Sequence, residues 1–300
     1  MNNPISSEQQ TFMDYLKFEK RYSLHTLESY GSDLCFFYEY MQAQYEITNI
    51  REVQASMIRG WLASMKEQGH SAKTINRRIS ALKSFYRFLQ RKGMVTNTPT
   101  AMIVSPKVNK RLPVYVEVKD INTLFSHIEF PDSWTGRLER LIFAIFYATG
   151  MRLSELTGLK EMQLDLLRNQ LKILGKGNKE RILPLTPDLK LLLSQYLQEK
   201  KEVFQNEAND FLLVNEKGRA LHPRYVQTVV KKYLQLVTTI EKKSPHVLRH
   251  SFATHLMNNG AELNAVKELL GHSSLAATQI YTHNTIEKLK DIHAKAHPKA

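Results

Sequence analysis

The chain has 300 residues, and 42% of them are hydrophobic, which is enough to bury a core in each of about two domains. Lys and Arg number 42 against 29 Asp and Glu, and this formal net charge of +13 favours a polyanionic partner such as nucleic acid over a random scatter of surface charge. One cysteine, Cys35, excludes an intrachain disulfide, and the polar N-terminus without a long apolar run argues against export or membrane insertion, so we expect a cytoplasmic protein.

The N-terminal part of the chain has a helical pattern. We expect four helices there, at about 7–21, 24–44, 54–68 and 71–92. Ser23 and Ser71 are suitable N-caps, and Gly69 and Gly93 are suitable C-terminal stops. These helices predict an N-terminal helical domain over residues 1–105.

The fourth predicted helix, SAKTINRRISALKSFYRFLQRKG, carries seven Lys or Arg residues and no acid. Its apolar residues recur at helical spacing: Ile75, Ile79, Leu82, Tyr86 and Leu89. Its basic residues on a different face are Lys73, Arg77, Arg87 and Arg91. A solvated basic face is the plain alternative, but such a face normally includes acids for i, i+4 pairing. We therefore predict that this face contacts a DNA backbone.

A linker is predicted at residues 106–113. The stretch MVTNTPTAMIVSPKVNKRLP contains three prolines, which disfavour helix continuation, and a basic cluster of Lys107, Lys110 and Arg111. These three cations would suit a strap that lies along a phosphate backbone, so we count them among the predicted DNA contacts.

The second domain is predicted at residues 114–300. It begins with helical patterns near 117–129 and 135–149, and QLKILGKGNKERILPL then predicts a β-hairpin at about 170–185. Further helices are expected at about 187–201, 223–239, 245–258, 262–270 and 285–294. The predicted fold is mainly α with a small antiparallel β-sheet, in which a four-helix domain precedes an α+β domain.

The stretch SPHVLRHSFATHL admits two kinds of site. His246 and His250 are four apart, as two metal ligands on one helix face would be, but Val247 stands where a metalloprotease needs its general-base Glu. Alternatively, Ser244 and the following proline start a helix that places His246 and Arg249 in its opening turns, where free backbone N–H groups favour an anion. We favour a phosphate site and expect no metal and no cofactor.

Five runs in order carry a family resemblance: ATGMRLSELTGL, GKGNKERILPL, SPHVLRHSFATHL, LLGHSSLAATQIYTH and IHAKAHPKA. They resemble the tyrosine recombinases of the phage integrase family, most closely the XerC/XerD group of bacterial enzymes that resolve chromosome dimers. The resemblance runs from about Tyr147 to Ala300, whereas the N-terminal domain matches by helix pattern and charge. It implies a SAM-like core-binding domain followed by a catalytic domain.

The resemblance also implies the site residues. They are the phosphate-clamping Arg152 and Arg249, the lysine Lys176, the histidines His246 and His272, the nucleophile Tyr281 and the supporting acid Glu155. This set suits cleavage of a phosphodiester without a metal, because cations stabilise the charge on the non-bridging oxygens while a phenol attacks. The lysine would then protonate the leaving 5′-oxygen.

The implied activity is site-specific recombination of duplex DNA through a 3′-phosphotyrosine intermediate, resolving chromosome or plasmid dimers during chromosome partition and cell division. The implied partners are a duplex with a recombination site and a homo- or hetero-tetramer with a second recombinase, in which the tail after Tyr281 docks on a neighbour; a DNA translocase is a further candidate. The alternatives are a mobile-element integrase, a type IB topoisomerase-like enzyme and a non-catalytic DNA-binding protein.

Overall fold

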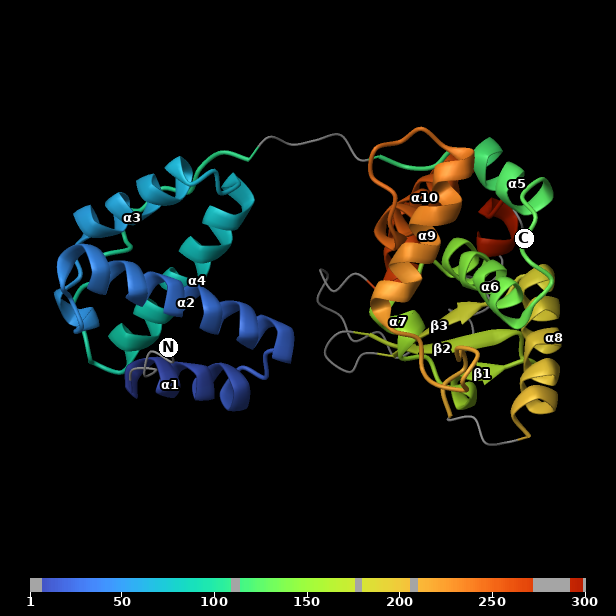
Figure 1. Ribbon diagram of the computed structural model, residues 1–300, viewed down its shortest axis with the longest axis horizontal. Coiled ribbons are helices and arrows are strands. Elements are labelled where there is room, and N and C mark those ends of the chain that lie inside the picture. Colours follow the sequence, from blue (N-terminus) through green and yellow to red (C-terminus); the bar gives the residue numbers. More distant parts are fainter. Residues whose placement is uncertain (1–6, 109–113, 176–179, 206–209, 272–291, 299–300) are drawn as a thin grey trace. The chain divides into compact units, whose positions relative to one another are not determined.

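The structure is a computed structural model that describes residues 7–108, 114–175, 180–205, 210–271 and 292–298. The chain divides into two compact units, Met1–Arg111 and Leu112–Ala300 (Figure 1). The predicted linker spans this division, and its limits stay a prediction. Within the described ranges, no helix is both long and apolar enough to cross a membrane.

The N-terminal unit is helical. Its elements are α1 (Ser7–Asp14), a π-helical turn (Tyr15–Glu19), α2 (Leu24–Tyr45), a 3-10 turn (Ile50–Glu52), α3 (Ala55–Glu67) and α4 (Ala72–Arg91). Helix α4 packs against the other three α-helices, around a core that includes the buried Phe12, Phe37, Trp61 and Phe85. The predicted four-helix domain is confirmed, although the first helix continues into a π-helical turn.

The predicted helix ends of this unit are also confirmed. The hydroxyls of Ser23 and Ser71 each accept a hydrogen bond from the backbone N–H three residues later, at 3.3 and 3.2 Å. Gly69 and Gly93 take left-handed backbone angles just after α3 and α4 end. Local sequence is therefore sufficient to start and stop these helices.

The C-terminal unit combines helices with one small sheet. Its elements are α5 (Val118–Ser126), α6 (Trp134–Thr149), α7 (Leu153–Thr157), a 3-10 turn (Glu161–Gln163), β1 (Leu164–Asp165), β2 (Gln170–Leu174), β3 (Glu180–Pro184), α8 (Pro187–Phe204), α9 (Pro223–Val237), α10 (Pro245–Asn258), α11 (Leu263–Leu270) and a short helix at 292–296. The predicted fold class is confirmed. Helix α7 and strand β1 were not predicted, because five and two residues are too few to establish a period.

The sheet is antiparallel, with the strand order β1-β2-β3. The register of the β2–β3 hairpin pairs Ile173 with Arg181 and Leu171 with Leu183. All four of these side chains are buried, so the inner face of the hairpin carries one arginine among apolar residues. The tip of the hairpin, 176–179, lies outside the described residues.

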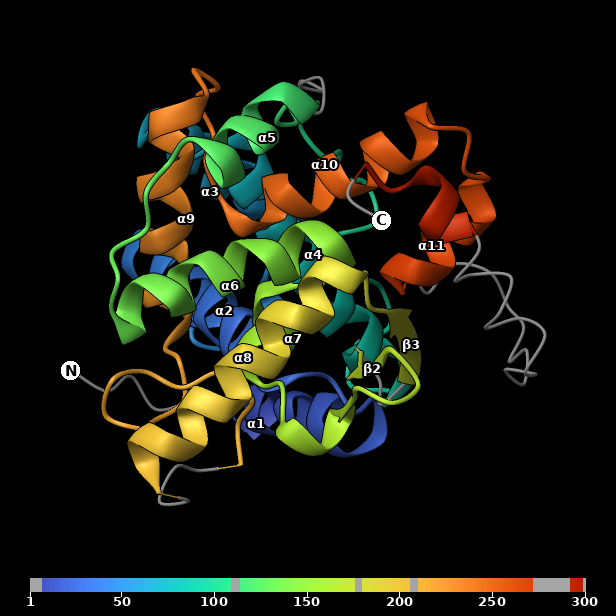
Figure 2. The same ribbon diagram turned by 90° about the vertical axis from the view of Figure 1, so that its right-hand side faces the viewer.

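Helix α6 forms the centre of the C-terminal unit. From Leu141 to Thr149 every residue of this helix is buried, and the helix packs against α8, α9 and α10. Figure 2 shows α8 lying beside α6. Helix α11 packs against α10 and β3, and its C-terminal end is hydrogen-bonded to the loop that follows α6. This loop contains Arg152, the first of the predicted catalytic residues in the sequence.

The described part of the tail packs on its own unit, next to α6 (Figure 1). Imidazole Nε2 atoms of His293 and His297 lie 2.8 and 2.9 Å from the carbonyl oxygens of Ala148 and Tyr147. The two imidazole rings are stacked with their centroids 4.9 Å apart, and burial lowers the pKa of His293, which favours its neutral form. Docking of the tail on a neighbouring protomer stays a prediction.

Candidate active site

The loop after α6 starts the site. Helix α6 ends at Gly150, which has a φ of +59°, and a side chain there would collide with Phe252 at 2.4 Å. Glycine is thus required both by the left-handed turn and by the close packing of α10. The Gly150 carbonyl accepts a hydrogen bond from Nη1 of Arg249 at 2.6 Å. The turn therefore connects the ATGMR and HVLRH motifs directly.

Glu155 is the acidic centre of the site. Its carboxylate accepts from the backbone N–H and from Nη1 of Arg152, at 2.7 and 2.8 Å. It also receives both Nη atoms of Arg181, at 2.9 and 2.7 Å, in a forked pair whose side chains are about 5% exposed. Burial alone would raise the pKa of Glu155, but the hydrogen bonds and charges of Arg181 and Arg152 bring this pKa down to about 2. The carboxylate is therefore ionised throughout the physiological range.

Three arginines converge on the C-terminal end of α11. The carbonyls of Leu269, Leu270 and Gly271 follow one another, and each accepts from a different guanidinium. The donors are Nε of Arg181 at 2.9 Å, Nη2 of Arg249 at 2.7 Å and Nη2 of Arg152 at 3.2 Å. A helix C-terminus carries partial negative charge, so it is a favourable place for cations. The end of α11 thereby brings together three arginines that come from three different sequence motifs.

Arg249 and Arg152 differ in exposure, and therefore in how easily a ligand from solvent can reach them. Arg249 is 5% exposed, and burial together with the charges of Arg152 and Arg181 lowers its pKa to about 10. It remains protonated at neutral pH. The Arg152 side chain is 36% exposed, so a ligand from solvent can reach it. One carboxylate against three guanidiniums leaves the described part of the site with an excess of positive charge.

His246 lies in the first turn of α10. Helix α10 begins with Ser244 at the N-cap position and Pro245 inside, as predicted, but the buried Ser244 hydroxyl makes no described hydrogen bond. His246 is exposed, and partial burial together with Lys242, Arg249 and other nearby cations lowers its pKa. The imidazole is therefore neutral at pH 7 and can donate one hydrogen bond to an anion.

The structure thus brings together Arg152, Glu155, His246 and Arg249 from motifs that are far apart in sequence. Lys176, His272 and Tyr281 lie outside the described residues, so their positions and the roles of the whole set stay predictions. Arg181 was missed, although it lies in the quoted GKGNKER run. The available signal was a charged residue on the inward side of an alternating strand, since such a residue needs a buried partner.

The predicted DNA contacts on α4 are exposed on one side of the helix. Two of them also have partners within the chain: Arg77 pairs with the buried Asp33, and Nη1 of Arg91 donates to the Tyr15 hydroxyl at 2.7 Å. Lys73 and Arg87 are exposed, as is Lys107 in the linker, whereas Lys110 and Arg111 lie outside the described residues. The four predicted DNA contacts on α4 therefore differ, because two of them have partners within the chain and two stand exposed.

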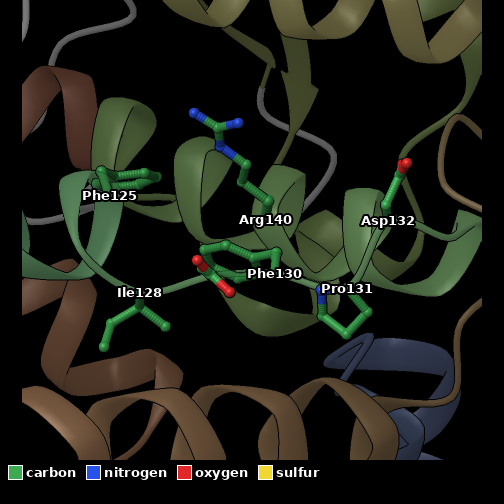
Figure 3. A pocket seen from close by; sticks show the side chains of 7 residues that line it. Phe125, Ile128, Phe130, Pro131, Asp132 and Arg140 are labelled. Carbon is green, nitrogen blue, oxygen red and sulfur yellow. The ribbon is translucent and has the colours of Figure 1, made fainter.

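A hollow of about 570 Å³ lies apart from the arginine site (Figure 3). It is lined by seven residues between Phe125 and Arg140, and none of them belongs to the site.

The described residues contain no candidate metal site. In the ranges that the structure describes, no three His, Cys, Asp or Glu side chains gather as a metal site would require. The expectation of a metal-free enzyme stays a prediction.

Comparison with known families covers both units. The pattern of the phage integrase family matches residues 115–288, and the pattern of the N-terminal SAM-like domain of phage integrases matches residues 10–93. The first match covers more than half of the chain and includes every predicted catalytic residue. The chain therefore belongs to the phage integrase family.

Relatives that match over nearly their full length show which class of enzyme within this family the chain resembles. Tyrosine recombinase XerC of Bacillus licheniformis is 37% identical over 96% of this chain and 95% of its own length. Tyrosine recombinase XerD of Halalkalibacterium halodurans is 35% identical over 99% of both chains. The XerH site-specific recombinase bound to its difH substrate, in a pre-cleavage complex, has a TM-score of 0.69 and 28% identity over 96% of this chain and 84% of its own. This chain is a tyrosine-type site-specific DNA recombinase.

Proposed function

We propose that this recombinase cleaves one strand of a duplex through attack by Tyr281, holds the strand as a 3′-phosphotyrosine and passes it to a second duplex. The observation that carries the proposal is the convergence of Arg152 and Arg249, from two motifs, on the end of α11. The segment that follows this end contains both His272 and Tyr281. In sequence, the proposed nucleophile therefore follows the helix end that both clamp arginines contact.

The charge of the site suits the proposed reaction. A phosphodiester has one negative charge, and attack by a phenolate produces a transition state with two. Three guanidiniums against the Glu155 carboxylate supply a matching excess of positive charge. Arg152 and Arg249 would hold the non-bridging oxygens, and the neutral His246 would add a hydrogen bond.

Tyr281 and Lys176 complete the chemistry as proposed roles. A cationic surrounding lowers the pKa of a phenol from about 10 and so makes Tyr281 a better nucleophile. Lys176 would give a proton to the departing 5′-oxygen. The phosphotyrosine bond keeps the energy of the broken phosphodiester, so rejoining needs no ATP.

Duplex DNA is the proposed substrate because two similar structures are complexes of XerH with difH substrates, before and after cleavage. The exposed Lys73 and Arg87 on α4 and Lys107 in the linker are proposed backbone contacts. Lys110 and Arg111 follow Lys107 in the sequence and are proposed as further backbone contacts. Arg77 and Arg91 are proposed to contact the backbone only through the N–H groups that do not bind Asp33 or Tyr15.

The proposed cellular role is resolution of chromosome or plasmid dimers in the cytoplasm, by a tetramer of this enzyme or of this enzyme with a second recombinase. The similarity to XerC and XerD over 96–99% of the chain supports this role above integration of a mobile element. Exchange of tails between protomers would require the hydrogen bonds of His293 and His297 to open. A DNA translocase stays a candidate partner.

The decisive experiment is capture of the covalent intermediate. DNA bound covalently to the enzyme is recovered from cells of the source under denaturing conditions and sequenced, and the recovered site is built into a nicked suicide duplex. The purified enzyme should form a detergent-resistant adduct with the 3′ end of the cleaved strand and leave a free 5′-hydroxyl. Absence of any adduct would reject the proposal in favour of a non-catalytic DNA-binding protein.

The same material separates recombination from topoisomerase activity. A recombinase should cleave only duplexes with the recovered site and should join strands from two different duplexes. Relaxation of a supercoiled plasmid that lacks the site, by the isolated monomer, would instead identify a type IB topoisomerase-like enzyme.

A further inference from the structure

Arg181 has a different environment from the two arginines of the proposed phosphate clamp. It projects from β3 into the interior of the C-terminal unit and is 3% exposed. All three of its guanidinium nitrogens donate hydrogen bonds, two to the Glu155 carboxylate and one to the Leu269 carbonyl. Arg249 is almost as buried, at 5% exposed, but its described hydrogen bonds go only to backbone carbonyls, whereas Arg181 is paired through both Nη atoms with the Glu155 carboxylate.

The partners of Arg181 connect it to the site on two sides. Through Glu155 it acts on Arg152, because the same carboxylate binds the backbone N–H and Nη1 of Arg152. Through Leu269 it holds the end of α11, and a Cβ atom added to Gly271 would lie 3.1 Å from its Cδ and Nη1 atoms. Gly271 is followed directly by His272.

The three arginines that bind the end of α11 differ in their other proposed tasks. In the proposed function, Arg152 and Arg249 must also donate to the phosphate, in addition to the carbonyls of Gly271 and Leu270. Arg181 has no proposed contact with the substrate, so its hydrogen bond to Leu269 is the one that does not depend on substrate binding.

We propose that Arg181 is a positioning residue for cleavage, which fixes Arg152 through Glu155 and fixes the C-terminal end of α11 through Leu269. This inference rests on the proposed function, because it assigns Arg181 to the same site. Misplacement of a reacting group by about 1 Å can cost about 100-fold in rate. Loss of Arg181 should therefore act on the rate of chemistry and not on duplex affinity.

The test uses the full-length enzyme and the suicide duplex described above, under single-turnover conditions. Arg181→Met should lower the cleavage rate constant by about 10- to 100-fold. Arg181→Lys should fall between this variant and the wild type, since an ammonium keeps the charge but cannot form the forked pair. The dissociation constant for the duplex should change little in both variants.

A matched control comes from the same unit. Lys200 is 4% exposed, and its Nζ donates to the Glu161 carboxylate and to the Phe211 carbonyl, so it is also a buried cation that joins an acid to a backbone oxygen. It lies outside the arginine site. Lys200→Met should lower the melting temperature but leave the cleavage rate of the folded enzyme near that of the wild type.

A double-mutant cycle with Arg152→Ala separates positioning from general stability. If Arg181 acts partly through Arg152, the two fold-changes should not multiply, and Arg181→Met should cost less in the Arg152→Ala background. A purely structural effect would reduce the rate by the same factor in both backgrounds. Multiplication of the two factors would therefore count against the assignment.

The pH profile gives an independent measurement. In the wild type Glu155 stays ionised down to a pKa of about 2, because Arg181 and Arg152 offset the effect of burial. Without Arg181, the effect of burial is offset less, so the pKa of Glu155 rises. Cleavage by the variant should then fall as the pH is lowered toward this raised pKa. The ratio of the variant's rate to the wild-type rate should therefore decrease with acidity. Arg181→Met combined with Glu155→Gln should remove this decrease.

The outcomes distinguish the inference from the function on which it rests. If the wild type forms no adduct, the proposed function fails. If the wild type cleaves and Arg181→Met cleaves equally fast with an unchanged pH profile, only the role of Arg181 is wrong. If Arg181→Met does not fold, Arg181→Lys carries the same rate and pH comparisons, and a wild-type result for it refutes the proposal.

Discussion

The arginine site of the C-terminal unit and the basic face of α4 use the same residue types in opposite ways. Arg249 and Arg181 are buried, and their described donors bind carboxylate or carbonyl oxygens. Lys73 and Arg87 stand on an open helix surface. Cations removed from water need such partners, whereas cations in water need none.

We expect the buried cations of this protein to fix the geometry of the site and the exposed cations of α4 to provide affinity for DNA. A buried guanidinium with two fixed acceptors has one orientation, which suits a reaction that needs a placed charge. An exposed ammonium adapts to any phosphate within reach and acts through counterion release, which makes binding strongly dependent on salt. Changes in the first region should therefore alter rates, and changes in the second should alter affinity.

The largest expected effect is that of removing the proposed nucleophile, which should stop cleavage without changing duplex affinity. Tyr281→Phe should abolish cleavage and leave the dissociation constant for the duplex nearly unchanged, because the missing hydroxyl is the nucleophile and most affinity comes from Lys and Arg. Adduct formation on the suicide duplex and a gel-shift titration measure the two quantities. Loss of binding in step with loss of cleavage would break the proposed division between the two regions.

The next effect tests the leaving group. Lys176→Ala should slow cleavage by about 10²- to 10⁴-fold, the usual contribution of a placed proton donor. A duplex with sulfur in place of the bridging 5′-oxygen should restore the rate, since a thiolate leaves without a proton. Arg152→Ala and Arg249→Ala should gain no such rescue, because their proposed charge acts on the non-bridging oxygens. Equal rescue of all three variants would make Lys176 another phosphate-binding residue.

A smaller effect distinguishes two arginines of α4. Arg87→Ala should weaken duplex binding modestly and reduce the slope of log K against log salt by about 0.9 for each phosphate that is no longer neutralised, with no change in stability. Arg77→Ala should in addition lower the free energy of unfolding by about 1–3 kcal/mol, because it leaves the buried Asp33 with one partner fewer. Salt-dependent binding and urea titration of the full-length chain measure these changes. Equal stability of the two variants would refute the distinction.

The smallest expected effect is that of chelation. Cleavage should proceed at an unchanged rate in excess EDTA, because arginine and lysine side chains are proposed to supply the positive charge that a metal would otherwise provide. The measurement is the single-turnover rate with and without the chelator. Loss of activity that zinc or magnesium restores would contradict the proposed roles of Arg152 and Arg249.

The sequence was most informative where local neighbours decide the structure. Ile75, Ile79 and Leu82 predicted the buried side of α4, and Ser23 and Ser71 predicted the starts of two helices, because periodicity and capping depend on residues within about four positions. The ordered motifs also identified the family and the proposed catalytic set. Short elements were missed, since α7 and β1 offer too few residues for a pattern.

The sequence alone was sufficient to predict the helical domain, the class of enzyme and the residues to test. Which partner each cation has depends on the tertiary structure. Arg181 binds Glu155, which is 26 positions away in the sequence, and Leu269, which is 88 positions away. Arg77 binds Asp33 at a separation of 44 positions. Such pairs form because packing of whole helices and strands brings the groups together and removes water around them, which no local pattern records.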